Sequence, residues 1–196
     1  MKTNNIMIVG VGGQGSLLAS KLIGNVAQQN GLEVKVSEVH GMSQRGGSVV
    51  TYVRYGDKVH SPIIAKGEAD IILSFELLEA ARYTERLKPG GKILTSTQTI
   101  DPMPVITGAM EYPDALAEKL KAAGFNLLAV DALSLAEEAG NYKAVNVVMI
   151  GVLSCFLDFP MECWEKAIEV CVPPKVLDVN KKAFTIGRVI GGTKLS

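Results

Sequence analysis

The sequence predicts an α/β fold: a Rossmann-like, mostly parallel sheet with helices on both faces and a helical C-terminal third. Over the first two thirds of the 196 residues, short runs rich in β-branched residues alternate with segments of helical periodicity. Such alternation is typical of a parallel sheet that is covered on both faces. A glycine-rich turn also joins the first strand-like run to the first helical segment. With no internal repeat and no low-complexity linker, we expect one domain over residues 1–196.

The first 56 residues contain three predicted strands and one helix. Residues 6–9 form a short apolar run that Gly10 ends, which predicts a buried strand. Residues 14–29 repeat leucine, isoleucine and valine at helical spacing and stop at an Asn-Gly pair. Residues 33–39 alternate valine with polar residues, and residues 49–55 are β-branched and aromatic, so both predict strands. The loop between these two strands has no helical pattern, which departs from a plain βαβαβ chain.

The middle of the chain continues the alternation. Residues 69–75 read ADIILSF and predict a buried strand. Residues 76–87 predict a helix, which we expect to end in a turn at the sequence KPGGK. A strand is then predicted at residues 92–96.

The remaining elements are mostly helical. Residues 101–113 contain three prolines and are expected to be extended or irregular. Residues 114–123 predict a helix closed by glycine, and residues 126–130 predict a strand. Four more helices are predicted at residues 132–139, 144–156, 161–171 and 174–189. The most apolar of them need burial either in this core or against another chain, and the sequence leaves both open.

The glycine turn has the spacing of a nucleotide-binding motif. Gly10, Gly12, Gly13, Gln14 and Gly15 satisfy G-x-G-x-x-G between a predicted strand and a predicted helix. Gly10 would permit a sharp turn, Gly12 would let a phosphate approach the backbone, and Gly15 would let the helix lie close to the sheet. The helix N-terminus would then attract the anion. The alternative is a tight turn that binds nothing.

A dinucleotide site usually has an acidic residue at the end of the second strand, where it binds the ribose. Glu38 lies near that position, but it is equally compatible with a solvated residue on an alternating strand. The segment after it continues into a second glycine-rich loop, where a plain dehydrogenase would begin its next helix.

The second loop reads HGMSQRGGS and contains Arg45, Gly46 and Gly47. Adjacent glycines can expose successive N–H groups as a concave anion site, and a guanidinium binds phosphate or carboxylate in a fork. If the two loops lie side by side at the carboxyl ends of the strands, they form one anion-binding crevice. Alternatively, Arg45 caps a helix carbonyl or pairs with an acid across a subunit boundary. His40 could act as an acid or base, although a structural role is the simpler reading.

Composition excludes several classes of partner. Twenty basic and twenty acidic residues balance, so net charge does not favour nucleic acid or an anionic membrane. No apolar run is long enough to span a bilayer, and we expect a cytoplasmic protein. The three cysteines, Cys155, Cys163 and Cys171, have neither zinc nor iron–sulfur spacing and are expected to be buried structural thiols. No metal or redox cluster is therefore expected on this chain.

Taken together, the motifs GVGGQG and EVHGMSQRGGSV resemble the gamma-type module of the 2-oxoacid:ferredoxin oxidoreductases. The segments ADIILSFELLEAARY, GGKILTSTQTI, NVVMIGVLS and VLDVNKKAFTIGR extend this resemblance over most of the chain. Within the family, the sequence is most similar to the small beta subunit of the indolepyruvate enzymes.

The resemblance implies a heteromeric complex that converts aryl pyruvates, derived from aromatic amino acids, to acyl-CoA. A larger subunit would carry thiamine diphosphate and iron–sulfur clusters and pass electrons to ferredoxin. Coenzyme A would bind this chain at Gly12, Gly13, Gln14, Arg45 and Gly46. The chain has no cluster motif and no thiamine motif of its own, so no catalytic residue is assigned to it.

Two other functions remain open at this stage. A free-standing NAD(P)-dependent dehydrogenase would need an acid or base near the nicotinamide, and only His40 is a candidate; the Y-x-x-x-K signature is absent. A structural subunit whose glycine turn has no ligand is the third hypothesis. Hydride transfer by the lone chain would favour the dehydrogenase, and titration with CoA would separate the enzyme subunit from the structural one.

Overall fold

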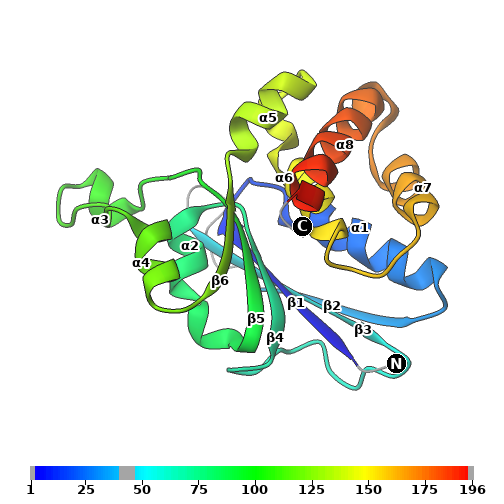
Figure 1. Ribbon diagram of the computed structural model, residues 1–196, viewed down its shortest axis with the longest axis horizontal. Coiled ribbons are helices and arrows are strands. Elements are labelled where there is room, and N and C mark those ends of the chain that lie inside the picture. The colour runs from blue at the N-terminus through cyan, green and yellow to red at the C-terminus, as the bar shows by residue number, and fades with distance from the viewer. Residues whose placement is uncertain (1–2, 40–46, 194–196) are drawn as a thin grey trace.

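The computed structural model describes residues 3–39 and 47–193. Its sheet has six strands in the order β2-β3-β1-β4-β5-β6 (Figure 1). Their bounds are β1 Asn4–Val11, β2 Glu33–Val39, β3 Ser48–Gly56, β4 Ala69–Ser74, β5 Leu87–Ser96 and β6 Asn126–Val130. The pairs β1–β4, β4–β5 and β5–β6 are parallel, whereas β3 is antiparallel to both β1 and β2. Only β3 is reversed, so the predicted mostly parallel sheet is confirmed.

Helices cover both faces of this sheet, as predicted (Figure 1). On one side lie α2 and α4, and on the other lie α1, α5, α6, α7 and α8. The helices are α1 Ser16–Gln29, α2 Leu77–Arg82, α3 Met103–Ile106, α4 Leu116–Ala122, α5 Ala132–Ala139, α6 Val145–Ser154, α7 Met161–Cys171 and α8 Leu177–Thr193. Short 3₁₀ turns occupy η1 Thr84–Arg86, η2 Tyr142–Ala144 and η3 Pro174–Val176.

Strand β1 shows how the sequence pattern builds the two cores. Successive side chains of a strand point to opposite faces of the sheet. Ile6 and Ile8 accordingly enter the larger core under α1, α6 and α8, while Met7 and Val9 enter the smaller core under α2. Because all of these side chains are buried, β1 is a continuous apolar run, as a central strand should be.

Helix α6 is a core helix, which settles the question that its apolar sequence left open. All ten of its residues are buried, between β5 on one side and α8 on the other. The contact with α8 is very close: a Cβ on Gly187 would lie 2.0 Å from the Val148 carbonyl oxygen, and a Cβ on Gly151 would lie 2.2 Å from that of Phe184. Glycine at these positions lets the two backbones touch.

The predicted helix at residues 76–87 is too long, and the turn predicted after it is wrong. Helix α2 ends at Arg82, and β5 already begins at Leu87, which pairs with Ala69. The ladder then shifts register, so that Ile71 pairs with Lys92 and the intervening residues 88–91, KPGG, form a bulge within the strand. Long-range pairing with β4 therefore overrides the local turn signal. The prediction of an extended or irregular segment at residues 101–113 also needs correction, because this segment contains the short helix α3.

Among residues 3–39 and 47–193, no helix combines the length and the apolar character that a bilayer-spanning segment needs.

Candidate functional site

The glycine turn lies where β1 ends and α1 begins, at the carboxyl edge of the parallel strands. Gly13 and Gly15 have positive φ angles of 96° and 85°, which a residue with a side chain rarely adopts. Gly15 is also the N-cap of α1, and the first turn of that helix contains no acidic residue. Gly13 is exposed, with nothing within 4 Å of the place where a Cβ would lie. The turn thus offers an open helix N-terminus to an anion.

Two of the glycines are required for reasons other than those expected. Gly10 belongs to β1, and a Cβ there would lie 2.8 Å from Oε1 of Gln14. Gly15 does not make room for the sheet; a Cβ there would lie 2.2 Å from the amide nitrogen of Asn146, the second residue of α6. Both glycines therefore admit a neighbouring side-chain amide.

Gln14 joins the ends of three strands through its side-chain amide. Its Oε1 accepts a hydrogen bond from the Val11 N–H at 2.7 Å, and its Nε2 donates to the Phe75 carbonyl at 3.0 Å. The same Nε2 lies 3.3 Å from Oε1 of Gln98, just after β5. The amide fixes the shape of the turn, and direct contact of Gln14 with a cofactor stays a prediction.

The end of the second glycine loop, at Gly47, lies directly beside the first turn. The Gly12 N–H donates to the Gly47 carbonyl at 2.9 Å. This bond extends the β1–β3 ladder, in which Val11 is paired with Ser48. The reversed direction of β3 brings its first residues to the edge where β1 ends. His40, Arg45 and Gly46 lie outside the described residues, so their predicted roles stay predictions.

A pocket of about 370 Å³ opens next to the glycine turn. Its walls come from Gly13 and Gln14, from Gln98 after β5, and from Tyr142 and Lys143 in η2. Leu133 and Val145 complete the lining. Lys143 supplies a cation and Tyr142, which is 59% exposed, supplies an aromatic ring. The pocket is thus open, partly apolar and equipped for an anionic ligand with a flat group.

The pocket residues from η2 and from the end of β5 were not predicted from the sequence. Tyr142 and Lys143 are more than 120 residues away from the glycine turn along the chain. Their only sequence signal was a polar break, GNYK, between two predicted helices.

A buried carboxylate, that of Glu79, holds the beginning of β3 beside the glycine turn. Glu79 is 5% exposed and accepts a hydrogen bond from the hydroxyl of Ser48, the first residue of β3. Ser48 also lies 3.0 Å from the Tyr83 hydroxyl, and Arg82 pairs with Glu79 at 3.3 Å. Burial raises the pKa of Glu79 above its ordinary value. These contacts fix the beginning of β3 against α2.

Glu38 occupies an unsuitable position for a ribose ligand of a plain dinucleotide site. In the usual arrangement, the strand that carries the acidic residue is next to β1. Here β3 lies between β1 and β2. Since neighbouring strands are about 4.8 Å apart, Glu38 is displaced from β1 by roughly 10 Å, two strand spacings. The topology disfavours NAD(P) in the standard pose.

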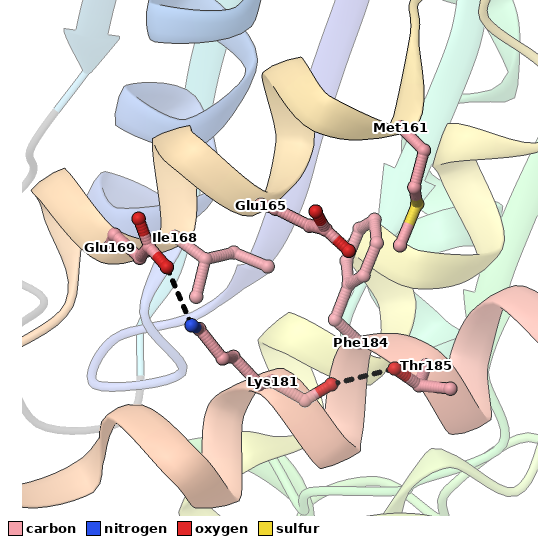
Figure 2. Close-up of a pocket in the computed structure, with 7 residues that line it drawn as sticks. All are labelled: Met161, Glu165, Ile168, Glu169, Lys181, Phe184 and Thr185. Atoms are coloured by element: carbon pink, nitrogen blue, oxygen red, sulfur yellow. Dashed lines mark hydrogen bonds and ion pairs between the residues drawn. The ribbon is translucent and has the colours of Figure 1, made fainter.

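A second pocket, of about 200 Å³, lies between α7 and α8. Figure 2 shows the Phe184 ring pointing from α8 toward α7, between Met161 and Glu165. Lys181 reaches across the crevice to Glu169 at 2.6 Å. This pocket contains none of the predicted site residues and is closed at one end by an ion pair, so we regard it as a crevice between packed helices.

The cysteines have the character of structural residues. All three are free and only half-buried, so they are less buried than expected. Burial raises the pKa of the Cys155 and Cys171 thiols, which makes them poor nucleophiles at neutral pH. In the part of the chain that the structure describes, no three His, Cys, Asp or Glu side chains cluster in a way that could hold a metal ion.

A mostly parallel sheet with a glycine turn at its carboxyl edge, beside an open pocket, defines a Rossmann-like α/β protein. The chain belongs to the pyruvate ferredoxin/flavodoxin oxidoreductase family, whose model matches residues 5–190. It is 48% identical over 193 residues to indolepyruvate oxidoreductase subunit IorB of Thermococcus kodakarensis, covering 95% of each chain.

Solved structures share the fold. The gamma subunit of a keto/oxoacid ferredoxin oxidoreductase from Geobacter sulfurreducens superposes with a TM-score of 0.73 at 23% identity, over 97% of this chain and 99% of that chain. The 2-oxoglutarate:ferredoxin oxidoreductase from Magnetococcus marinus gives a TM-score of 0.75 at 20% identity. The match covers 98% of this chain but only 32% of that one, so there the fold is one part of a longer chain.

Proposed function

We propose that this chain is the non-redox subunit of a cytoplasmic 2-oxoacid:ferredoxin oxidoreductase of the indolepyruvate type. The larger subunit of the complex carries thiamine diphosphate and iron–sulfur clusters, decarboxylates an aryl 2-oxoacid and passes electrons to ferredoxin. The observation that carries the proposal is the 48% identity to an indolepyruvate oxidoreductase subunit over 95% of both chains. The hydrogen bond between Gly12 of the first glycine motif and Gly47 of the second supports it.

Coenzyme A is the ligand that we assign to the carboxyl edge of the sheet. The pocket there combines an open glycine turn, one cation at Lys143 and one exposed ring at Tyr142. These groups suit a phosphorylated carrier with an adenine ring better than they suit a neutral metabolite. The Magnetococcus marinus relative, solved with coenzyme A bound, lends further support.

Each residue of the pocket has a separate task in this proposal. The backbone at Gly13 and the Lys143 ammonium bind phosphate, and Tyr142 offers a stacking surface for a base. Gln14 keeps the turn in shape through its three contacts. The bound CoA supplies the thiol that accepts the acyl group, and this chain only binds and orients it. Arg45, two residues before Gly47, would add a second cation.

Calorimetric titration of CoA into the purified complex tests this assignment. We expect Lys143→Ala to weaken CoA binding about tenfold, which is about 1.4 kcal/mol. Arg45→Ala should cost on the order of 1.5–3 kcal/mol if the guanidinium meets phosphate directly. Lys121→Ala is the matched control, because this exposed lysine lies on α4, away from the pocket.

The binding role is wrong if the Lys143→Ala and Arg45→Ala complexes each bind CoA as tightly as the Lys121→Ala control. Steady NAD-linked turnover by the isolated chain would instead favour a dehydrogenase. Failure of the complex to bind CoA at all would leave the chain as a structural subunit.

A further inference from the structure

Between β5 and α4 the chain leaves the body of the protein and returns, forming a segment that we call the arm, residues 101–111. In Figure 1 this segment, with α3, stands apart from α2 and α4. None of its residues is buried, and only Pro102 and Val105 are even partly covered. The arm therefore contributes little to either core of this chain.

The arm nevertheless carries large apolar side chains. Met103, Ile106 and Met110 are 62%, 64% and 65% exposed. Single exposed apolar residues are common on protein surfaces, but three within eight positions on a protruding segment form a concentrated apolar tip. Methionine suits such a tip, because its flexible thioether adapts to the shape of a partner.

The arm is held in a defined shape at both ends by one buried carboxylate. Glu76, which is 1% exposed, accepts hydrogen bonds at Oε1 from the Tyr112 hydroxyl at 2.6 Å and from the Ile100 N–H at 3.2 Å. Its other oxygen accepts from the Glu79 N–H at 2.8 Å and so caps α2. The two ends of the arm are thus fixed to the start of that helix.

Hydrogen bonds within the arm add to this order. The Ala109 and Met110 N–H groups both donate to the Pro104 carbonyl, at 2.8 and 3.0 Å. Proline at positions 102 and 104 restricts the backbone further. An ordered apolar tip loses little conformational entropy on binding, which favours affinity for a partner.

Position and charge indicate which partner the tip fits. The residue Gln98, just before the arm, lines the CoA pocket that we propose, so the arm rises from the edge of the sheet that carries the site. The acyl donor is on the larger subunit, and that subunit must cover this edge to reach the pocket; this step rests on the proposed function. The arm contains two acidic residues, Asp101 and Glu111, and no basic one. A complementary surface is an apolar hollow with lysine and arginine around it.

We propose that the arm is a docking element, which places Met103, Ile106 and Met110 in an apolar, basic-rimmed hollow on the larger, thiamine diphosphate-bearing subunit. The acidic residues steer the encounter, and the apolar tip provides the affinity.

The test compares two sets of serine substitutions in the full chain. The arm variant is Met103→Ser/Ile106→Ser/Met110→Ser. The control is Val170→Ser/Val189→Ser, two valines that are 65% and 61% exposed on α7 and α8, across the molecule from the arm (Figure 1). Binding to the purified larger subunit is measured by biolayer interferometry, and CoA binding to each isolated chain is measured by calorimetry.

We expect the arm variant to bind the larger subunit about 100-fold more weakly, mainly through a faster off-rate, and the control to stay within about twofold of the wild type. Asp101→Asn/Glu111→Gln should slow association at low salt by severalfold. CoA affinity of the isolated chain should be the same in all variants. This last measurement separates the two proposals. If the wild-type chain does not bind CoA, the CoA assignment is contradicted, and the measured affinity of the arm for the larger subunit is unaffected.

The proposal is overturned if the arm variant binds the larger subunit within about threefold of the wild type. It is equally overturned if light scattering shows that the substitutions change self-association of this chain while binding to the larger subunit is retained, because the tip would then contact a second copy.

Discussion

Replacing Gly13 and Gly15 separately by alanine should have very different effects on stability. Both residues have positive φ angles, so an alanine at either position costs about 1–2 kcal/mol in backbone strain, partly offset by a stiffer unfolded chain. At Gly13 nothing lies within 4 Å of the new Cβ. The Gly13→Ala variant should therefore lose only about 1 kcal/mol in its free energy of unfolding.

At Gly15 the new methyl group meets Asn146. The Cβ would lie 2.2 Å from Nδ2, against 3.4 Å or more for an ordinary van der Waals contact, so one of the two groups must move by about 1.2 Å. Asn146 is 6% exposed, donates to the Gly15 carbonyl at 3.3 Å and accepts from the Val147 N–H at 2.9 Å. Displacing it leaves a buried amide without partners, which costs about 1–3 kcal/mol. The total for Gly15→Ala is then about 2–5 kcal/mol.

A double-mutant cycle isolates the clash. Asn146→Ala alone should lower the free energy of unfolding by about 1 kcal/mol. The double variant should be more stable, by at least about 1 kcal/mol, than the sum of the two single losses predicts, because the clash is absent. Trp164, the single tryptophan, is fully buried and reports unfolding by fluorescence in a urea titration. Equal losses for the two glycine variants, or strictly additive losses in the cycle, would refute the reasoning.

Two further predictions concern the contact of α6 with α8 and the buried acid. Gly187→Ala places a Cβ 2.0 Å from the Val148 carbonyl oxygen and should lower Tm by about 6–12 °C in calorimetry. Gly192→Ala is the control on the same helix, because nothing lies within 4 Å of its Cβ, and it should not lower Tm. Equal losses of Tm in the two variants would contradict the close contact between α6 and α8. Burial raises the pKa of Glu79 in the folded state above its value near 4.5 in the unfolded chain. Protonated Glu79 therefore contributes fully to the free energy of unfolding below pH 4.5, and this contribution is lost as the pH rises through the folded-state pKa. Glu79→Gln should therefore gain stability relative to the wild type as pH rises from about 4 to 7 in urea titrations, and a pH-independent difference would speak against the shift.

Much of the fold could be predicted because nearby residues in the sequence determine where many helices and strands begin and end. The strands at 33–39 and 126–130 and the helices at 132–139 and 161–171 match the structure to the residue. Glycine or proline lies within two residues of each of these elements, at Gly31, Gly124, Gly140 and Pro160, and a residue of that kind limits the backbone whatever surrounds it. The helix predicted at 76–87 was too long because Leu87 belongs to β5, where it pairs with Ala69, and the local sequence does not encode that long-range interaction.

The site divides in the same way. A motif contained in six residues identified the glycine turn, but the actual neighbours of Gly10 and Gly15 are amides from Gln14 and Asn146. The lysine and tyrosine of the pocket come from a turn far along the chain. Their proximity depends on the order of the strands and on where α6 begins, and no local pattern reports either.

The reversal of β3 has a consequence for how accurately Gly47 is positioned beside the first glycine turn. The bond between Gly12 and Gly47 is one rung beyond a ladder that runs from Asn4–Tyr55 to Val11–Ser48. A slip of one residue would turn Val53 and Tyr55 out of the core and break that rung at the same time. The pairing of two central strands therefore fixes Gly47 beside Gly12, and this contact is as ordered as the sheet itself.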